Sequence, residues 1–243
     1  MNRTIKKVAV LGSGIMGSRI ACHFANIGVE VLLLDIIPRE LLAEEQKKGL
    51  TIEDKSVRNR IVNTALQNTL FQKPASLYNK KSASLITLGN FDDDFSRISE
   101  CDWVIEVVVE NLKIKKQVYS TVEKYRKPGT LITSNTSGIP IHLMAKGRSE
   151  DFRKHFCGTH FFNPPRYLRL LEIIPTKETQ KEVIEFLMHY GDLFLGKETV
   201  LCKDSPAFIA NRIGIYSILS AMHTVEKMGL TVGEVDKLTG PII

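Results

Sequence analysis

The chain has 243 residues, of which 43% are hydrophobic and 25% charged, and its net charge is +6. These values are ordinary for a globular protein with a substantial core. No apolar run approaches the roughly 18 residues of a membrane span, so we expect no membrane partner.

Strand and helix patterns alternate from the start, with an apolar strand at 8–11, a helix at 15–26 and a second strand at 29–34. Residues 38–81 carry helical patterning without a strand signal, which predicts a pair of helices projecting from the sheet. Further strands are expected at 85–88, 103–109, 131–134, 158–162, 171–174 and 199–202, and helices at 112–125 and 180–193. This alternation predicts an α/β fold with a mostly parallel sheet covered on both faces.

The character of the chain changes at Ser205-Pro206. Serine is a good helix N-cap and proline a favoured first helical residue, so we expect a helix from here to residue 228. Thr231 and Glu234 resemble a capping box for another short helix. A helix and a half cannot bury its apolar side alone. We therefore interpret 1–204 as one domain and 205–243 as the beginning of a helical C-terminal domain that is truncated.

The four cysteines are scattered, without a Cys-x-x-Cys pair or a histidine at metal-ligand spacing, so we expect reduced thiols and no metal. The first residues pass directly into an apolar strand, which leaves no room for a signal peptide and predicts a cytoplasmic protein. Basic residues outnumber acidic ones between 39 and 81. They form either a solvated helical face or a surface for a polyanionic small molecule. Aromatic residues are not interleaved with this charge, which argues against a nucleic-acid partner.

The segment Gly12-Ser13-Gly14-Ile15-Met16-Gly17 matches the G-x-G-x-x-G pattern of dinucleotide sites. It follows a predicted strand and opens a predicted helix, and Asp35 ends the next strand, as the pattern requires. The glycines allow a tight turn and close approach to a pyrophosphate at the helix N-terminus. Asp35 can accept hydrogen bonds from the adenosine ribose and repels the 2′-phosphate of NADP. NAD is therefore the predicted cofactor.

A histidine and a glutamate stand on two neighbouring predicted strands. His160 lies near the end of the first strand, and Glu172 interrupts the apolar residues of the second. A carboxylate among leucine and isoleucine is costly unless it is paired. Pairing with His160 would orient the imidazole and raise its basicity, as a general base requires. The residues alone leave open whether His160 is catalytic or a hydrogen-bonded core histidine.

Taken together, the ordered motifs resemble those of the L-3-hydroxyacyl-CoA dehydrogenase family, and most closely the dehydrogenase part of bacterial fatty-acid oxidation proteins. The resemblance covers essentially the whole chain. It rests on the glycine motif, Val-Glu-Asn-Leu at 109–112, Ser-Asn-Thr-Ser at 134–137, His-Phe-Phe-Asn-Pro at 160–164, Leu-Glu-Ile-Ile at 171–174, and Lys-Asp-Ser-Pro at 203–206 through Asn-Arg at 211–212. It implies a Rossmann-type NAD-binding domain with a helical insertion over about 38–81, followed by an α-helical domain. A homodimer through the C-terminal helical region of the full-length protein is also implied.

The resemblance implies NAD-dependent oxidation of a (3S)-3-hydroxyacyl-CoA to 3-oxoacyl-CoA in fatty-acid β-oxidation. His160 would be the general base and Glu172 its partner, while Ser137 and Asn211 position the substrate. The implied cofactor contacts are Gly12, Ser13, Gly14, Ile15, Met16, Gly17, Asp35, Glu110, Lys115, Ser137 and Asn163. An acyl-CoA substrate would give the basic residues of 39–81 a purpose as a landing site for the CoA phosphates.

Simpler interpretations of these positions remain. Glu110 and Lys115 suit a solvated helix start, Asn163 a turn before Pro164, and Ser137 a helix cap. Two other functions also remain. A free-acid β-hydroxyacid dehydrogenase would need a catalytic lysine where this sequence has Asn211-Arg212. A dinucleotide-binding structural or sensor protein without turnover would be expected to have a damaged catalytic set.

Overall fold

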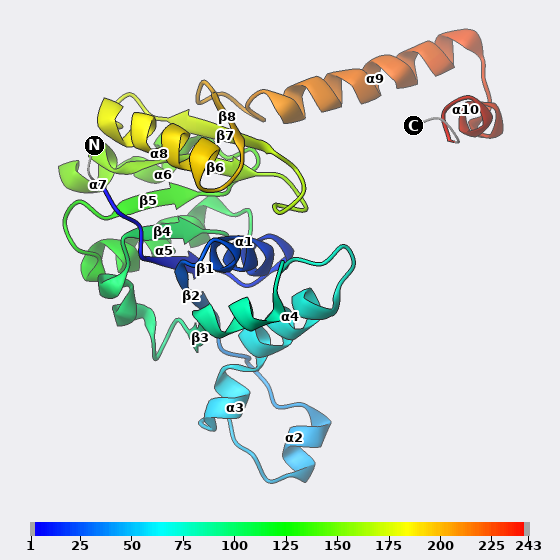
Figure 1. Cartoon of the computed structure of the whole chain (residues 1–243). Coiled ribbons are helices and arrows are strands. Elements are labelled where there is room, and N and C mark those ends of the chain that lie inside the picture. Colours follow the sequence, from blue (N-terminus) through cyan, green and yellow to red (C-terminus); the bar gives the residue numbers. More distant parts are fainter. Residues whose placement is uncertain (1–2, 241–243) are drawn as a thin grey trace.

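Eight strands form one sheet in the computed structural model of the chain, which describes residues 3–240 (Figure 1). The strands are β1 (Lys7–Leu11), β2 (Glu30–Asp35), β3 (Ile86–Asn90), β4 (Trp103–Glu106), β5 (Leu131–Ser134), β6 (Phe156–Phe161), β7 (Leu170–Pro175) and β8 (Glu198–Leu201). Their order is β3-β2-β1-β4-β5-β6-β7-β8. Neighbours are parallel except β6 and β7, which run antiparallel. The predicted mostly parallel, Rossmann-type sheet is confirmed.

Helices and short 3₁₀ segments connect the strands. They are α1 (Ile15–Asn26), α2 (Ala43–Lys47), α3 (Lys55–Arg58), α4 (Arg60–Phe71), η1 (Lys80–Leu85), η2 (Phe95–Glu100), α5 (Leu112–Tyr125), α6 (Ile141–Ala145), α7 (Glu150–Lys154), α8 (Lys181–Leu193), α9 (Ala210–Met228) and α10 (Val232–Thr239). No helix among the described residues is long and apolar enough to cross a membrane.

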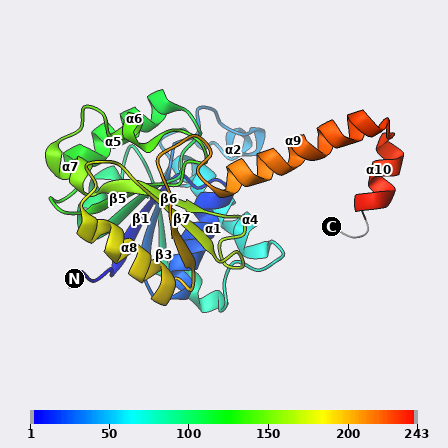
Figure 2. The same cartoon turned by 90° about the horizontal axis from the view of Figure 1, so that it is seen from above.

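Each face of the sheet has its own apolar core, because successive strand residues point to opposite faces. On β1, Val10 belongs to a buried cluster with Phe24 of α1, whereas the next residue, Leu11, belongs to a cluster with Tyr119 of α5. Figure 2 shows α1 and α8 on one side of the sheet and α5, α6 and α7 on the other. The near-continuous apolar runs of the inner strands follow from this double cover.

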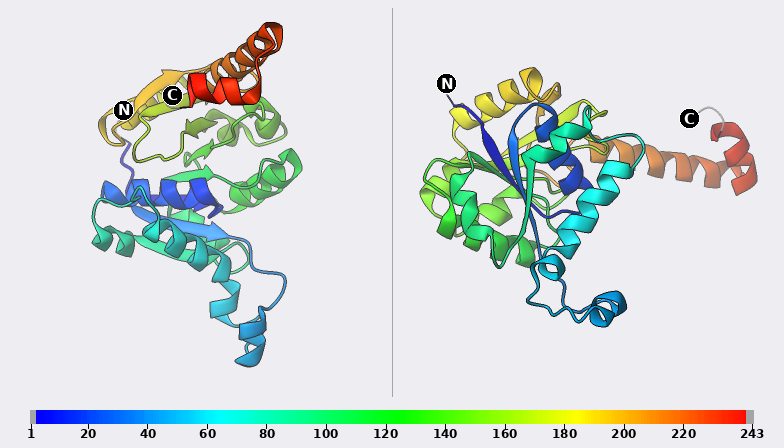
Figure 3. Two further views of the ribbon diagram at one scale, coloured as in Figure 1. Left: turned by 90° about the vertical axis from the view of Figure 1, so that its right-hand side faces the viewer. Right: turned by 60° about the horizontal axis from the view of Figure 1, so that its bottom comes forward.

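The helical insertion differs from the predicted pair of helices. Residues 38–81 contain three helices, α2, α3 and α4, and the start of η1. Only α4 packs firmly on the sheet, through Val62 and Leu66, which lie four residues apart and so share one helix face. Helix α2 has no buried residue. Figure 3 shows α2 and α3 extending from the body of the molecule beyond α4.

The helix predicted to begin at Ser205-Pro206 begins later, at Ala210. Ala207 and Phe208 have positive φ values of 61° and 48°, and this left-handed conformation is incompatible with a continuous helix. The strain is offset by tertiary contacts, since the side chain of Phe208 is buried in the core. The expected N-cap is therefore wrong. The helix start is determined by packing and not by the local Ser-Pro signal.

The last two helices extend away from the sheet (Figures 1 and 2). Neither α9 nor α10 contains a buried residue. The predicted capping box is confirmed, because Thr231 and Glu234 each accept a hydrogen bond from the other's backbone N–H. Helix α9 ends at Gly229, whose φ of +65° is the usual left-handed helix end.

Candidate active site

The glycine turn lies where the strand order reverses, between β1 and β4, at the carboxyl edge of the sheet. Ligands of open α/β sheets bind in the crevice at this position. Gly12 has a φ of +106°, and a Cβ there would stand 2.6 Å from the carbonyl oxygen of Val107, which follows β4. A Cβ on Gly17 would stand 1.8 Å from the carbonyl oxygen of Gly12. These two glycines are required for the turn to close.

Gly14 differs from the other two glycines of the motif, because a Cβ built on it would meet no atom within 4 Å. It is the N-cap of α1, which has no side-chain cap and no acidic residue in its first turn. Within residues 3–240, the backbone at Gly14 therefore faces open space, with N–H groups that no side chain caps and with the positive end of the helix. This cradle fits the pyrophosphate of a dinucleotide.

Asp35 ends β2 beside this turn. Its Oδ2 atom accepts hydrogen bonds from the backbone N–H of Ser13 at 2.6 Å and from the Ser13 hydroxyl at 2.5 Å. The carboxylate is therefore placed next to the phosphate cradle, as the sequence pattern requires. Its contact with a ribose stays a prediction.

His160 and Glu172 form a directly paired couple on the antiparallel strands β6 and β7. The Nδ1 atom of His160 lies 2.7 Å from Oε2 of Glu172, and the two residues are only 4% and 1% exposed. The predicted contact between them is confirmed. Residues directly opposite each other on antiparallel strands project their side chains to the same face of the sheet. This pairing explains how two residues twelve positions apart in the chain come into contact.

The second oxygen of Glu172 is also satisfied. Oε1 accepts hydrogen bonds from the backbone N–H groups of Ile209 at 3.0 Å and Ala210 at 2.8 Å, where α9 begins. Burial alone would raise the pKa of Glu172. The hydrogen bonds from His160 and from these two N–H groups outweigh burial and hold the pKa below its usual value. Glu172 is therefore a carboxylate at neutral pH.

An ionised Glu172 determines the tautomer of His160. The carboxylate can only accept, so Nδ1 carries the proton and Nε2 of the neutral ring keeps its lone pair. Among residues 3–240, Nε2 has no hydrogen-bond partner. Phe162 and Phe208 flank the ring, with centroids 4.5 and 5.7 Å away. The arrangement presents one basic nitrogen, oriented by a carboxylate and bordered by apolar rings.

Ser137 and Asn211 are brought together, although 74 residues separate them in the chain. The side-chain amide of Asn211, in the first turn of α9, donates to the backbone carbonyl of Ser137 at 3.2 Å. The Ser137 side chain is exposed and is available to a ligand. The two residues therefore connect the end of β5 with the start of α9.

Glu110 and Lys115 also meet, since Lys115 Nζ lies 3.3 Å from Glu110 Oε2. Glu110 is exposed, whereas Lys115 is only 1% exposed. A solvated position for Lys115 at the helix start is therefore wrong. Asn163, which is exposed before the cis peptide bond to Pro164, accepts a hydrogen bond from Arg19 of α1. Their contacts with NAD stay predictions.

Sequence reasoning missed one buried residue, Glu106 at the end of β4. It is 0% exposed and is paired with Lys115, whose Nζ is 2.7 Å from Glu106 Oε1. The signal was present in the sequence, because Glu106 directly follows the apolar run Trp103-Val104-Ile105. Glu172 was recognised by the same kind of signal, a carboxylate within an apolar strand. The predicted strand at 103–109 hid it, whereas the strand actually ends at Glu106.

A sequence model described as "3-hydroxyacyl-CoA dehydrogenase, NAD binding domain" matches residues 7–205. The chain belongs to this family. It is 54% identical over its whole length to a probable 3-hydroxyacyl-CoA dehydrogenase of Bacillus subtilis, covering 31% of that protein. Over 89% of its length it is 42% identical to a putative fatty acid oxidation complex trifunctional enzyme of Rickettsia felis, covering 28% of it. The crystal structure of M. tuberculosis FadB2 superposes with a TM-score of 0.74 at 28% identity, over 96% of this chain and 76% of that one.

Membership in the family supports NAD as the cofactor, in agreement with the cradle at Gly14 and the position of Asp35. The chain spans about a third of the length of the two curated relatives. No group of three or more His, Cys, Asp or Glu residues suited to a metal ion occurs in the described part of the chain.

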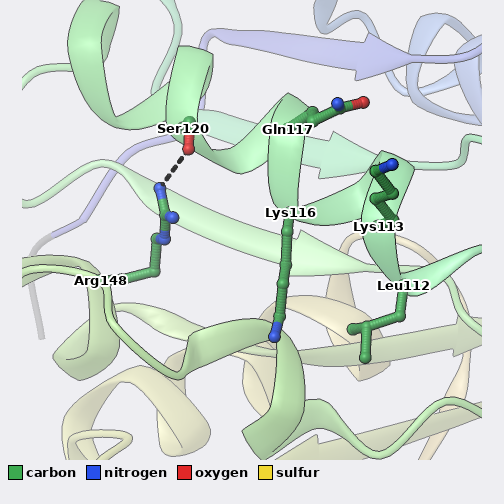
Figure 4. Close-up of a pocket in the computed structure, with 6 residues that line it drawn as sticks. All are labelled: Leu112, Lys113, Lys116, Gln117, Ser120 and Arg148. Carbon is green, nitrogen blue, oxygen red and sulfur yellow. Dashed lines mark hydrogen bonds between the residues drawn. The ribbon is translucent and has the colours of Figure 1, made fainter.

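A separate surface hollow of about 590 Å³ lies against α5 and contains none of the predicted site residues. It is lined by Leu112, Lys113, Lys116, Gln117, Ser120 and Arg148. Figure 4 shows Arg148 reaching to the hydroxyl of Ser120, while the side chain of Lys116 extends along the hollow.

Gly17 is crowded by backbone and Gly14 faces open space, so replacing each of them with alanine should have different effects. Gly17→Ala should reduce the free energy of unfolding by about 1–3 kcal/mol and so lower the unfolding temperature, because its methyl group collides with backbone. Gly14→Ala should keep the unfolding temperature and weaken NADH binding, because its methyl group occupies the phosphate cradle. Thermal unfolding and NADH fluorescence titration measure the two effects. Unchanged NADH affinity in Gly14→Ala would contradict the cradle.

The charge state of Glu172 predicts a pH-dependent stability difference. At pH 7 Glu172→Gln should cost about 1–3 kcal/mol, because hydrogen bonds to a charged acceptor are lost. A carboxyl group with a depressed folded pKa stabilises above its unfolded pKa, about 4.3, and that contribution disappears as pH falls through the folded pKa. Urea unfolding of the wild type and of Glu172→Gln between pH 7 and pH 3 measures the difference in their free energies of unfolding. This difference should become smaller at acid pH. A constant difference would contradict an ionised Glu172.

Proposed function

We propose that this chain is the NAD-binding and base-carrying part of an enzyme that oxidises (3S)-3-hydroxyacyl-CoA to 3-oxoacyl-CoA in fatty-acid β-oxidation. The observation that carries the proposal is the buried pair of His160 and Glu172, with Nδ1 and Oε2 2.7 Å apart. It leaves a lone pair on Nε2, which is the state that a base for an alcohol requires. The names of the B. subtilis and R. felis relatives support the same reaction and pathway.

The proton path follows from the geometry of this pair. NAD, which the turn at Gly14 and Asp35 would hold, would supply the hydride acceptor for the substrate carbon. His160 removes the hydroxyl proton at Nε2, and the resulting imidazolium is stabilised by Glu172 across the Nδ1 contact. In the reverse direction the same imidazolium returns the proton to the carbonyl oxygen. The apolar rings of Phe162 and Phe208 lie next to the imidazole, with centroids 4.5 and 5.7 Å away.

Ser137 and Asn211 supply positioning for the acyl group, and their mutual contact of 3.2 Å holds them on one side of the site. Glu110, Lys115 and Asn163 are assigned to the cofactor side, and Asp35 to the adenosine ribose. Asn211 also argues against a free-acid β-hydroxyacid dehydrogenase, because such an enzyme would need a lysine in this helix.

The organisation of the whole protein is part of the proposal. Residues 1–204 form the NAD-binding domain, with the insertion of about 38–81 offering basic residues to the CoA phosphates. Residues 205–243 begin a helical domain, through which the full-length protein forms a homodimer. A cytoplasmic location is supported by four cysteines that are buried and unpaired, as expected in a reducing compartment.

Replacing the base tests the reaction. In the full-length protein, His160→Ala should lower acetoacetyl-CoA reduction about 10²- to 10⁴-fold, because the proton donor is lost. Glu172→Gln should lower turnover less, and both variants should retain NADH binding. NADH absorbance measures turnover, and His189→Ala, an exposed histidine on α8, is the matched control. Unimpaired turnover in His160→Ala would overturn the mechanism.

Asp35→Ala tests the choice of cofactor. The variant should bind NADH about tenfold more weakly, because a charge-assisted hydrogen bond worth about 1.5–3 kcal/mol is lost. Its affinity for NADPH should rise relative to NADH, since the repulsion of the 2′-phosphate disappears. Fluorescence titrations with the two nucleotides provide the ratio. An unchanged ratio would remove Asp35 from the specificity argument.

A further inference from the structure

The loop that joins β6 to β7 connects the two strands that carry the proposed base and its partner. It comprises residues 162–169, which we call the hairpin loop. It begins two residues after His160 and ends three residues before Glu172. The ring of Phe162 lies 4.5 Å from the imidazole of His160, and Asn163 is assigned to the cofactor side. Any contact that fixes this loop therefore also fixes the surroundings of the base.

Lys197, which directly precedes β8, reaches the hairpin loop from inside the protein. The residue is only 4% exposed. Its Nζ atom donates to the backbone carbonyl of Leu168 at 2.9 Å and to that of Pro165. The ammonium group also lies 5.8 Å from the centroid of the Phe161 ring, within the range of a cation–π contact. One buried cation thus contacts the end of β6 and two points of the loop that follows it.

The charge of Lys197 is not compensated. No ion pair among residues 3–240 includes this lysine. Burial lowers the pKa of Lys197 to about 8, so the group is still an ammonium ion at pH 7. A buried charge without an opposite charge destabilises the folded state, and lysine is almost never buried unpaired. Stability alone therefore does not explain why a lysine stands here.

The hydrogen bonds of the hairpin loop explain what the cation does. The backbone N–H groups of Tyr167 and Leu168 both donate to the carbonyl of Pro164, at 2.9 and 3.0 Å, and so form a turn. The carbonyls of Pro165 and Leu168 accept from Lys197 instead. An ammonium group has three N–H donors and can bridge two carbonyls. Lys197 thus completes the hydrogen bonding of this turn from the buried side.

A second cation fixes the outer side of the hairpin loop. Arg166 donates to the backbone carbonyls of Ala75 at 2.6 Å and Leu77 at 3.0 Å, and its guanidinium carbon lies 4.0 Å from the centroid of the Tyr78 ring. Ala75 and Tyr78 are exposed, so water can replace these contacts when they are lost. The site of Lys197 is closed to solvent, and its carbonyl groups have no such substitute.

We propose that Lys197 is a positioning residue, which holds Pro165 and Leu168 so that the start of the hairpin loop keeps its place beside His160. The destabilising burial of its charge is retained because it fixes this loop. The importance of the loop for catalysis rests on the proposed function. The hold on the loop does not, and it exists before any ligand binds.

Amide hydrogen exchange and thermal unfolding of the ligand-free, full-length protein test the hold. Lys197→Met should accelerate exchange at the amides of Tyr167 and Leu168 by about tenfold, because their turn loses the donor on its buried side. The unfolding temperature should stay equal or rise, because an unpaired buried charge is removed. Unchanged exchange at these two amides would overturn the proposal. A lower unfolding temperature, or failure to fold, would show a purely structural role and would also overturn it.

Two other cations serve as controls. Lys181→Met removes an exposed lysine on α8 and should leave both measurements unchanged. Arg166→Met removes a cation of the hairpin loop itself and should accelerate exchange at 167–168 by less than about twofold, because water replaces its contacts. An effect of Arg166→Met as large as that of Lys197→Met would overturn the assignment of the hold to Lys197.

Kinetics connect the hold with the proposed reaction. In the reduction of acetoacetyl-CoA, Lys197→Met should lower kcat about tenfold, because the surroundings of His160 are no longer fixed. It should also raise the KM for NADH, because Asn163 moves with the loop. A residue that only supports the fold would change the amount of active protein and leave the KM for NADH unaltered, and that result would overturn the catalytic part. If the proposed reaction fails, the wild type does not turn over either, while the exchange results still decide whether Lys197 holds the loop.

Discussion

The buried carboxylate of Glu172 is the constraint on which the site depends. Removing a carboxylate from water costs several kcal/mol, and the cost is offset only when every lone pair finds a donor. Here one oxygen faces the imidazole of His160, and the other receives the first N–H groups of α9. One side chain therefore determines the tautomer of the proposed base and also anchors the start of α9.

The same device appears at the end of β4. Glu106 is as deeply buried as Glu172, and its donors come from α5, from β5 and from its own strand end. The two carboxylates are joined at the surface, because Glu110, which pairs with Lys115, accepts the backbone N–H of Ser137, whose carbonyl oxygen accepts from Asn211 of α9. The loops at the carboxyl edge of the sheet are thus held by hydrogen bonds and ion pairs of carboxylates as well as by apolar packing. Such satisfied networks give a defined geometry that apolar contacts alone do not.

Much of this arrangement was predictable from the sequence, for identifiable reasons. The glycine motif and Asp35 have a fixed spacing because local backbone geometry imposes it. Glu172 stood out because a charged residue interrupts an apolar strand. Glu106 obeys the same logic but was hidden by a strand prediction that ran three residues too far. The start of α9 was beyond local signals, since Ser205-Pro206 is a good helix opening and only the burial of Phe208 overrides it. The division of the insertion into three helices was also beyond the sequence signals, because α2 and α3 are short and largely exposed and therefore show little apolar periodicity.

The attachment of α9 connects the chemistry with the architecture. No residue of α9 is buried, so apolar packing within the described chain does little to hold the helix in place. Its first turn is held by Glu172 and by the contact of Asn211 with Ser137. Glu172 therefore has two structural tasks at once. Through Oε2 it pairs with His160, and through Oε1 it accepts the N–H groups at the start of α9, and all of these hydrogen bonds favour its carboxylate form. The charge that fixes the tautomer of His160 thus also holds the helix turn that carries Asn211.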